Sequence, residues 1–207
     1  IQQVFLYNLN ANANNEASTA TNTEQAATLV NAVTPAHLFM RAIKGIDAEK
    51  SHLYFEDLRD EIVSFLWENA HVDEEVTRMS EEFGHNWTAV HVRRGDYERL
   101  QNTYTLPSSG YYEKGLRAVR KNSETTKNVV FSDNVEIARK LLPGAIQYVG
   151  PTDLPRVGDT LMLMAMATNI VGANSSLSWW AAYLQPQDLG LKVFPHPWFV
   201  RNSPSAE

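Results

Sequence analysis

The chain of 207 residues contains no cysteine. This absence excludes disulfide bonds, thiolate nucleophiles and cysteine-ligated metal sites, and it fits a reducing compartment. The six histidines show none of the spacings that are typical of metal ligands, and no HExxH motif occurs. We therefore expect no metal ion that is bound by protein ligands alone.

Excess positive charge and long apolar runs are also lacking. The formal net charge is −6, which argues against a general nucleic-acid or membrane-surface binder, because such proteins need a basic face. No apolar run approaches about 18 residues, so the sequence predicts no transmembrane segment. The first six residues lack the basic start and the longer apolar stretch of a signal peptide.

The first third of the chain has a weak pattern. Residues 8–34 consist mostly of Asn, Ala and Thr, which predicts a loop or connector with one short helix at residues 26–33. Residues 54–66 and 72–83 then carry apolar side chains at helical spacing, which predicts two packing helices. The second of these is expected to end at Gly84.

From residue 86 onward, short apolar strands alternate with helices. We expect strands at residues 87–92, 128–131, 146–149, 169–172 and 191–194, and helices at residues 109–119, 134–142, 159–168 and 175–184. This alternation predicts an α/β fold with a doubly wound, Rossmann-like parallel sheet, which binds ligands at the carboxyl ends of its strands. No GxGxxG follows any strand, so an oxidoreductase that uses a dinucleotide is disfavoured.

The first of these strands ends in HVRRGD, which places two guanidinium groups beside an imidazole and a carboxylate. The planar fork of arginine suits bidentate contact with phosphate oxygens. Adjacent strand residues point to opposite faces, so we expect Arg93 to hold a phosphate and Arg94 to bind Asp96 or Asp133. His91 should share the face of Arg93.

Simpler interpretations of the same residues stay open. Arg93 and Arg94 could form surface salt bridges with Asp96 or Glu98. His91 could be a packed, hydrogen-bonded residue of the core.

The strand at residues 169–172 is followed by Asn174, Ser175 and Ser176 at the start of a helix. Free backbone N–H groups and the helix dipole make such a start an anion site, and serine hydroxyls add donors. Gly172 would allow the backbone to come close to a ligand. The alternative is that Asn174 or Ser175 only caps the helix.

Two carboxylates complete the set of candidates. Asp133 and Asp159 would repel a diphosphate but could accept paired donors from a guanine edge or bridge ribose hydroxyls. Otherwise Asp133 is a turn residue and Asp159 a helix N-cap.

Taken together, these segments resemble the α-1,2-fucosyltransferase family over residues 52–199. Three signature blocks occur in the family's order, at residues 91–98 (HVRRGDYE), 129–134 (VVFSDN) and 169–184 (NIVGANSSLSWWAAYL). The ending at residues 194–199 (FPHPWF) and the segment at residues 53–65 (LYFEDLRDEIVSF) are similar to the family as well.

The resemblance implies an inverting, two-domain GT-B type glycosyltransferase. Such an enzyme moves L-fucose from GDP-fucose to the 2-hydroxyl of a terminal galactose without a metal ion or other cofactor. Its partners would be GDP-fucose and a galactose-terminated glycan. By motif position, Arg93 would hold the β-phosphate, His91 would lie near the nucleotide, Ser175 and Ser176 would meet the phosphates, and Asp159 would read guanine.

The catalytic residues expected from this resemblance are Arg93 and Asp96. Asp96 is the nearest candidate for the base that takes the acceptor proton, and Glu98 is the second. Asp96 could instead only position Arg94.

One family feature is lacking, the glycine-rich GGLGNQ segment of the acceptor domain. We therefore expect residues 1–85 to be a partial, mostly helical acceptor-side region, truncated at its N-terminus, and residues 86–207 to be the domain that binds GDP-fucose. A nucleotide-sugar or carbohydrate-binding module without catalysis is the alternative. The expected location is cytoplasmic or membrane-peripheral for a bacterial member, and the Golgi lumen for a eukaryotic fragment.

Overall fold

The fold was analysed in a computed structural model, which describes residues 3–6, 56–123 and 127–200. Its contacts divide the chain into two compact units. One unit combines residues 1–10 with residues 72–207, and the other consists of residues 11–71. The connector and the short helix that we predicted before residue 35 lie outside the described residues.

The described part of the smaller unit is helical. A 3-10 turn, η2 (Glu56–Leu58), leads directly into α3 (Arg59–Asn69). The predicted helix at residues 54–66 is therefore confirmed in type, although the structure extends it by one turn at its C-terminal end.

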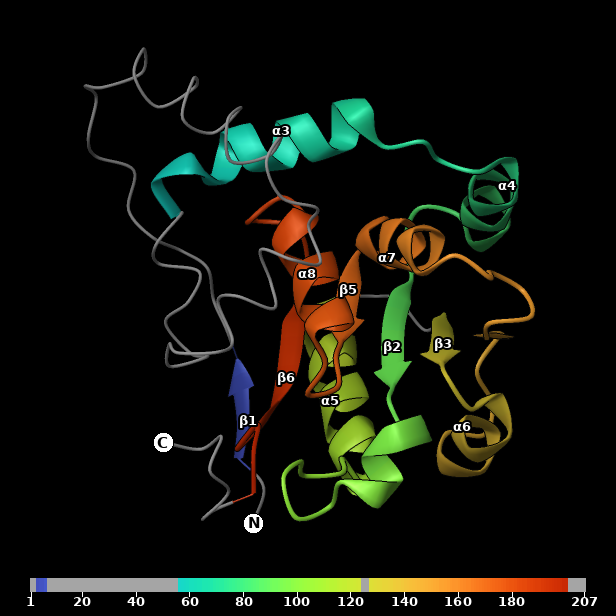
Figure 1. Ribbon diagram of the computed structural model, residues 1–207, viewed down its shortest axis with the longest axis vertical. Helices are drawn as coiled ribbons and strands as arrows, with labels where there is room; N and C mark the ends of the chain where they lie inside the picture. Colours follow the sequence, from blue (N-terminus) through green and yellow to red (C-terminus); the bar gives the residue numbers. More distant parts are fainter. Residues whose placement is uncertain (1–2, 7–55, 124–126, 201–207) are drawn as a thin grey trace. The chain divides into compact units, whose positions relative to one another are not determined.

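The larger unit is an α/β domain, shown in Figure 1. Its strands are β1 (Gln3–Leu6), β2 (Thr88–Val92), β3 (Asn128–Ser132), β4 (Gln147–Val149), β5 (Asn169–Val171) and β6 (Lys192–His196). Its helices are α4 (Glu74–Phe83), η3 (Gly95–Arg99), α5 (Ser109–Asn122), α6 (Val135–Leu141), α7 (Val157–Ala165) and α8 (Ser176–Leu184). The predicted alternation of strands and helices is confirmed, with bounds that move by up to three residues.

The strands form one sheet in the order β1-β6-β5-β2-β3-β4. All neighbours are parallel except β1 and β6, which pair antiparallel. The sequence analysis did not predict β1, whose four residues lie far from β6 along the chain. The parallel, Rossmann-like sheet was predicted correctly.

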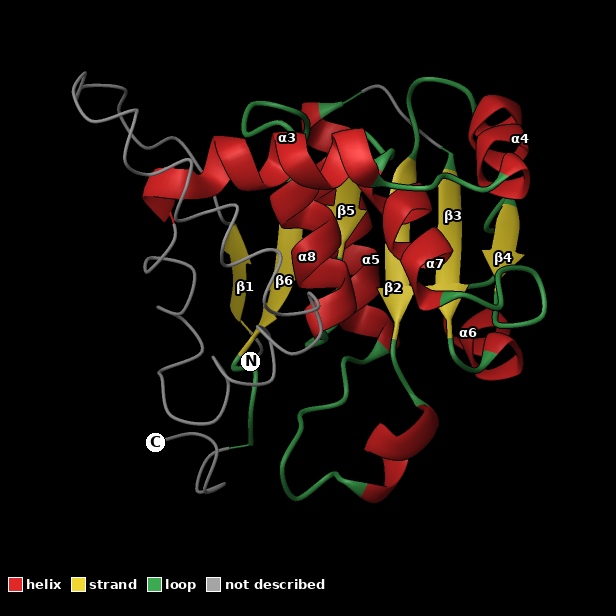
Figure 2. Ribbon diagram, turned by 45° about the horizontal axis from the view of Figure 1, so that its top comes forward, coloured by secondary structure: helices red, strands yellow, loops and turns green. Residues whose placement is uncertain are grey.

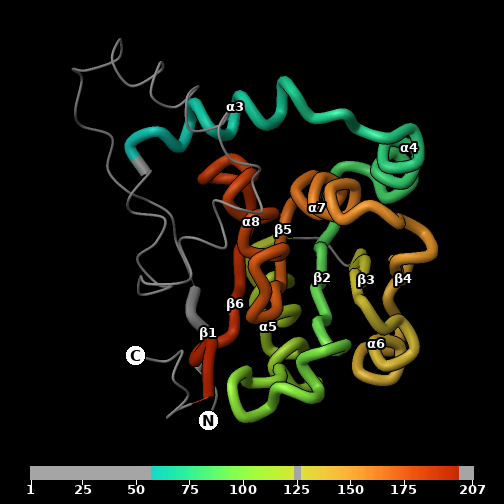
Figure 3. Tube along the Cα trace, in the orientation of Figure 1, coloured from blue at the N-terminus to red at the C-terminus, as the bar shows by residue number. Residues whose placement is uncertain are grey.

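The order of the strands reverses between β2 and β5. From β2 the chain moves outward through β3 to β4, then returns to the other side of β2 and continues through β5 to β6. The trace in Figure 3 shows β2 and β5 side by side. Such a switch point leaves a crevice outside the carboxyl ends of the two strands, where α/β sheets bind their ligands.

Helices cover both faces of this sheet. On one face, α5 and α6 pack over strand residues Val90, Val92, Val130, Val171 and Val193. On the other face, α7 and α8 contact each other in front of the strands in Figure 2, and α4 contacts α7. Strand residues alternate between the faces, so His91 and Arg93 belong to the face of α7 and α8.

The helix α4 packs as its sequence predicts. Val76, Met79 and Phe83 are buried at helical spacing, and Gly84 ends the helix with a positive φ of 77°. This helix belongs to the larger unit, whereas the predicted division at residue 85 assigned it to the first part. The roles proposed for the two parts stay predictions.

Candidate functional site

Arg93 leaves the carboxyl end of β2 and is held by two carboxylates. Its guanidinium contacts Asp96 Oδ1 at 2.6 Å and Asp133 Oδ2 at 2.9 Å. A guanidinium has five N–H donors, so these two contacts leave three for a ligand. The side chain is 32% exposed, and a ligand can therefore reach it.

Arg94 turns to the opposite face, as strand alternation requires. Its guanidinium is buried and donates to the carbonyl oxygen of Pro107 at 2.5 Å, just before α5. We predicted that this side chain would bind Asp96 or Asp133, and that prediction is wrong. Asp133 does bind Arg94, but it accepts from the backbone N–H at 2.9 Å, because it lies on the other face.

Asp133 follows β3 and braces the turn after β2. Its two oxygens accept from Arg93 and from the Arg94 backbone. Gly95 permits this approach, because a Cβ at that position would lie 2.3 Å from Asp133 Oδ2. In this arrangement Asp133 positions Arg93, and the predicted contact with a guanine edge or ribose stays a prediction.

His91 is a buried residue of β2 that lies two positions before Arg93. Burial, and to a smaller extent the positive charge of Arg93, lower the pKa of His91 to about 3. The ring is therefore neutral near pH 7. Its Nδ1 atom is buried and has no hydrogen-bond partner among the described residues. Most buried polar atoms are paired, so this nitrogen is a candidate contact for a ligand.

Asn174 and Ser175 follow β5, beside the end of β2. Both amide hydrogens of Asn174 are engaged, with the carbonyl oxygens of Thr105 at 2.7 Å and Trp198 at 2.9 Å. The amide of Asn174 therefore connects the loop before α5 to the segment after β6, and its two donors are not available to a ligand. Its Oδ1 atom is buried and has no partner among the described residues.

The first turn of α8 lacks a side-chain cap. Ser175 occupies the N-cap position, as the capping interpretation expected, but its side chain makes no capping hydrogen bond. Asn174 Oδ1 accepts no hydrogen bond from the helix start either. Ser176 is the first helical residue, and the N–H groups around it keep their capacity to bind an anion.

Gly172 has a packing role in the structure. A Cβ at this position would lie 2.3 Å from Cε1 of Phe194, and the carbonyl oxygen of Gly172 accepts from the Tyr111 hydroxyl at 2.7 Å. The close approach that we predicted therefore involves an aromatic ring of β6.

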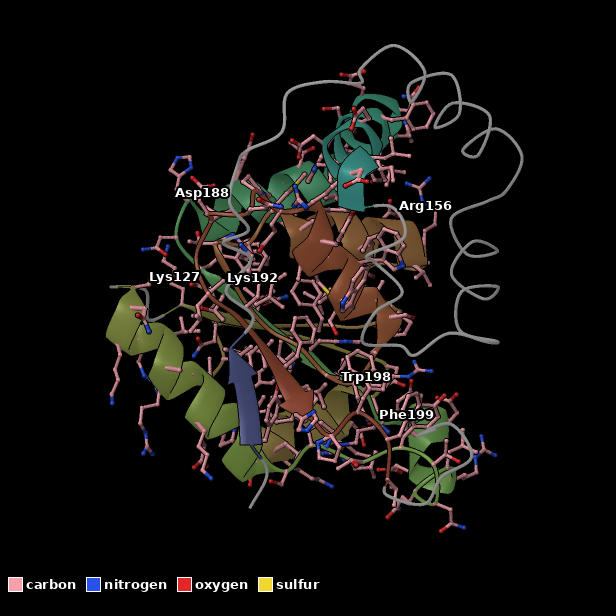
Figure 4. All side chains as sticks on the ribbon, turned by 90° about the vertical axis from the view of Figure 1, so that its left-hand side faces the viewer. Lys127, Arg156, Asp188, Lys192, Trp198 and Phe199 are labelled. Carbon is pink, nitrogen blue, oxygen red and sulfur yellow. The ribbon has the colours of Figure 1, made fainter. Side chains whose placement is uncertain are left out.

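Asp159 lies in the first turn of α7 and is not its N-cap, which is Arg156. The carboxylate is buried, and Arg156 binds both oxygens, at 2.7 and 3.1 Å. Arg156 also contacts Asp73 at 2.7 Å and is labelled in Figure 4. These contacts tie Asp159 to the start of α4, and its predicted contact with guanine stays a prediction.

Asp96 is the most accessible of the site carboxylates. It lies in the short helix η3 and is 50% exposed, with one oxygen on Arg93. The salt bridge that we weighed as an alternative for Arg93 is therefore present. It does not conflict with the proposed role as base, because a carboxylate has further lone pairs that can accept a proton.

Two hollows of the larger unit lie away from these strand ends. One, of about 220 Å³, is lined by Ser80, Glu81, Gly84 and His85, where α4 ends. The other, of about 40 Å³, lies under α5 and is lined mostly by apolar residues, which include Val90 and Leu116. Among the residues that the structure describes, no group of three or more His, Asp or Glu side chains could hold a metal ion.

Sequence reasoning missed a set of aromatic residues near Arg93. Tyr97 lies under the guanidinium, and Tyr104 stacks on Tyr97 at 4.1 Å between ring centroids. Tyr97 stands in the HVRRGDYE block, but the role of its ring depends on how the loop folds back, which no local pattern encodes.

Comparisons with known proteins identify the family of the chain. The profile of glycosyl transferase family 11 matches residues 38–200. The chain belongs to glycosyl transferase family 11. The matched region includes the ends of β2, β3 and β5.

Several known proteins share moderate identity with the chain. An α-1,2-colitosyltransferase of Escherichia coli is 34% identical over 56% of the chain, and the O-antigen biosynthesis glycosyltransferase WbnK of the same species is 32% identical over 58%. A galactoside 2-α-L-fucosyltransferase, SEC1 of Bos taurus, is 26% identical over 65%. These matches confirm the resemblance to α-1,2-fucosyltransferases.

The same matches cover 42%, 41% and 40% of the relatives, so the chain spans about two fifths of their length. No solved structure matches the chain significantly. None of the helices in the described ranges has the length and apolar character that crossing a bilayer requires.

Proposed function

We propose that this chain contains the donor-binding domain of an inverting α-1,2-fucosyltransferase of the GT-B type. The enzyme would transfer L-fucose from GDP-fucose to the 2-hydroxyl of a terminal galactose. The observation that carries the proposal is the switch point between β2 and β5. An accessible arginine follows β2, and a helix start without a side-chain cap follows the neighbouring strand β5.

The diphosphate would lie between these two groups. Val90 pairs with Val171, so the segments that lead to Arg93 and to Ser176 leave the sheet from adjacent strands. Arg93 would use its remaining N–H groups for the β-phosphate while Asp133 keeps it in place. The α8 N–H groups would complete the contact through the positive end of the helix dipole.

The transfer would proceed by direct displacement at C1 of fucose. The acceptor hydroxyl attacks C1, the bond from C1 to the β-phosphate oxygen breaks, and GDP leaves with the electron pair. Negative charge builds on that phosphate, and one well-placed donor lowers such a barrier by roughly 3 kcal/mol. Asp96 would take the proton of the hydroxyl.

Recognition of guanine would fall to Asp159. Its carboxylate can accept from two adjacent donors of the base, but Arg156 occupies both oxygens. Arg156 is exposed and has a second partner in Asp73, so it can release Asp159 without losing all its contacts.

A second donor is favoured by the names of the relatives. One E. coli relative is called a colitosyltransferase and the mammalian ones fucosyltransferases, and these names share transfer to a 2-position. The linkage is therefore better supported than the sugar, and α-1,2-colitosyl transfer is the alternative activity.

The test is to incubate the chain with a galactoside and either GDP-fucose or GDP-colitose, and to detect product and free GDP by mass spectrometry. We expect an α-1,2-linked product from GDP-fucose, both with and without EDTA, which removes divalent metal ions. GDP binding with neither transfer nor hydrolysis would instead identify a binding module. If GDP does not bind at millimolar concentration, the proposal is wrong.

A further inference from the structure

The guanidinium of Arg93 is held in its plane by two carboxylates, but an aromatic ring supports its face. The Arg93 Cζ atom lies 5.2 Å from the centroid of the Tyr97 ring. A cation at this distance from a tyrosine ring is attracted by the ring's quadrupole. Ion pairs fix where the guanidinium nitrogens lie, whereas a stacked ring fixes the tilt of the group.

Tyr97 is itself held by a row of rings. Tyr104 stacks on it with centroids 4.1 Å apart and an angle of 11° between the planes. The ring of Phe199 follows at 5.5 Å from that of Tyr104. Because Tyr104 covers one face of Tyr97 at stacking distance, Arg93 takes the other face. Arg93, Tyr97, Tyr104 and Phe199 thus form one row, called here the aromatic row.

Backbone contacts fix the far end of the aromatic row. Tyr104 and Phe199 form an isolated antiparallel bridge, and the Val200 N–H donates to the Thr103 carbonyl oxygen at 2.9 Å. Phe199 and Trp198 follow β6, as labelled in Figure 4. The carbonyl oxygen of Trp198 also accepts from Asn174. The tail after β6 therefore braces the loop that follows β2.

We propose that Tyr97 is a positioning residue for Arg93, backed through Tyr104 and Phe199 by the tail of the chain. This inference depends on the proposed function, because the group that Arg93 must meet is the β-phosphate of GDP. Without the ring, the salt bridges to Asp96 and Asp133 would still hold the guanidinium, but its open N–H donors could tilt away from the phosphate.

The main competing role for Tyr97 is a stacking platform for the acceptor sugar. Both faces of its ring are covered, one by Tyr104 and the other by Arg93. A sugar ring stacks on an open aromatic face, so Tyr97 does not offer a platform. Burial raises the pKa of Tyr97 and keeps its hydroxyl neutral, which removes it as a base near pH 7.

The test compares Tyr97→Leu with Tyr97→Phe by titration with GDP and with GMP, which lacks the β-phosphate. Tyr97→Leu should weaken GDP binding about tenfold and change GMP binding less than about twofold, a size that fits a partly desolvated cation–π contact. Tyr97→Phe restores the ring and should bind GDP within about threefold of the unchanged chain.

The matched control is Tyr148→Leu. Tyr148 also lies under an arginine, with Arg139 Cζ 4.2 Å from its ring centroid, but it belongs to the core under α5 and α6. It should leave the ratio of GDP to GMP affinity unchanged. If Tyr97→Leu weakens GDP and GMP equally, its role is structural and the inference is wrong.

A second measurement does not depend on GDP. The ring current of Tyr97 should shift the Nε–H resonance of Arg93 upfield in a nitrogen–proton NMR spectrum, with the peak assigned from Arg93→Lys. The shift should persist in Tyr97→Phe and disappear in Tyr97→Leu. An unchanged peak in Tyr97→Leu overturns the inference, whereas failure of the unchanged chain to bind GDP overturns only the proposed function.

Discussion

The carboxyl ends of β2 and β5 are neighbours in one sheet, yet they are built in opposite ways. The end of β2 consists of charged side chains, and each of Arg93, Arg94 and Asp133 is fixed by partners from other elements. The end of β5 contains no charged residue between Gly172 and Ser178. An arginine must be held by its neighbours, whereas the helix itself orients the N–H groups at its start.

The largest difference between the two ends should come from Arg93→Ala. Charged hydrogen bonds contribute about 1.5–3 kcal/mol each, so losing those to a diphosphate should weaken GDP binding at least about 100-fold. Isothermal titration calorimetry measures this loss. Arg99→Ala is the matched control, since Arg99 is exposed at the end of η3 and should not change the affinity.

Asp96→Asn should separate catalysis from binding at the β2 end. A general base contributes about 100-fold or more to rate, so transfer should slow by that factor while GDP affinity changes less than about threefold. Initial rates at saturating donor provide the measurement. Full activity would remove Asp96 as the base and leave Glu98 as the candidate.

Arg94→Ala should act on stability and not on the ligand. The substitution leaves the Pro107 carbonyl oxygen unpaired and a cavity beside α5, so the free energy of unfolding should fall by about 2 kcal/mol. Arg93→Ala should lower it by less than about 1 kcal/mol, because that side chain is partly exposed. Urea denaturation measures the free energy of unfolding of both variants. Equal decreases in the two variants would contradict the assignment of Arg93 and Arg94 to opposite faces.

The β5 end can be tested by removing one backbone N–H. Proline is tolerated at the first position of a helix, so Ser176→Pro should leave stability within about 0.5 kcal/mol and weaken GDP binding about tenfold. Ser109→Pro makes the same change at the start of α5, on the other face, and should not affect GDP. Equal GDP affinity in both variants would remove the α8 start from the site.

The smallest effect concerns His91 and pH. Its pKa is lowered from 6.5 to about 3 on folding, so the unfolded chain binds a proton more readily below pH 6.5. The contribution of His91 to the free energy of unfolding is fully present above pH 6.5 and is lost as the pH falls toward 3. Between pH 6.5 and 5.5 it should decrease by about 1 kcal/mol. In His91→Gln this part of the pH dependence should be absent. If the variant and the unchanged chain show the same dependence of stability on pH, His91 is not a neutral, buried residue.

The sequence predicted the sheet well because the chain alternates short apolar strands with helices, and each element signals itself locally. It missed β1, because four residues whose partner is β6 at the far end of the chain carry no local signal. At the site, strand alternation correctly separated Arg93 from Arg94. The partners were assigned wrongly because the turn through η3 brings Pro107 to Arg94, and tertiary packing alone decides that contact.

The most direct test of a shared site is a crystal structure of the chain with GDP. We predict that the diphosphate lies at the switch point, with oxygens within hydrogen-bonding distance of both the Arg93 guanidinium and the N–H groups of Ser175 or Ser176. A diphosphate that contacts Arg93 alone, or that lies away from the ends of β2 and β5, would contradict the account.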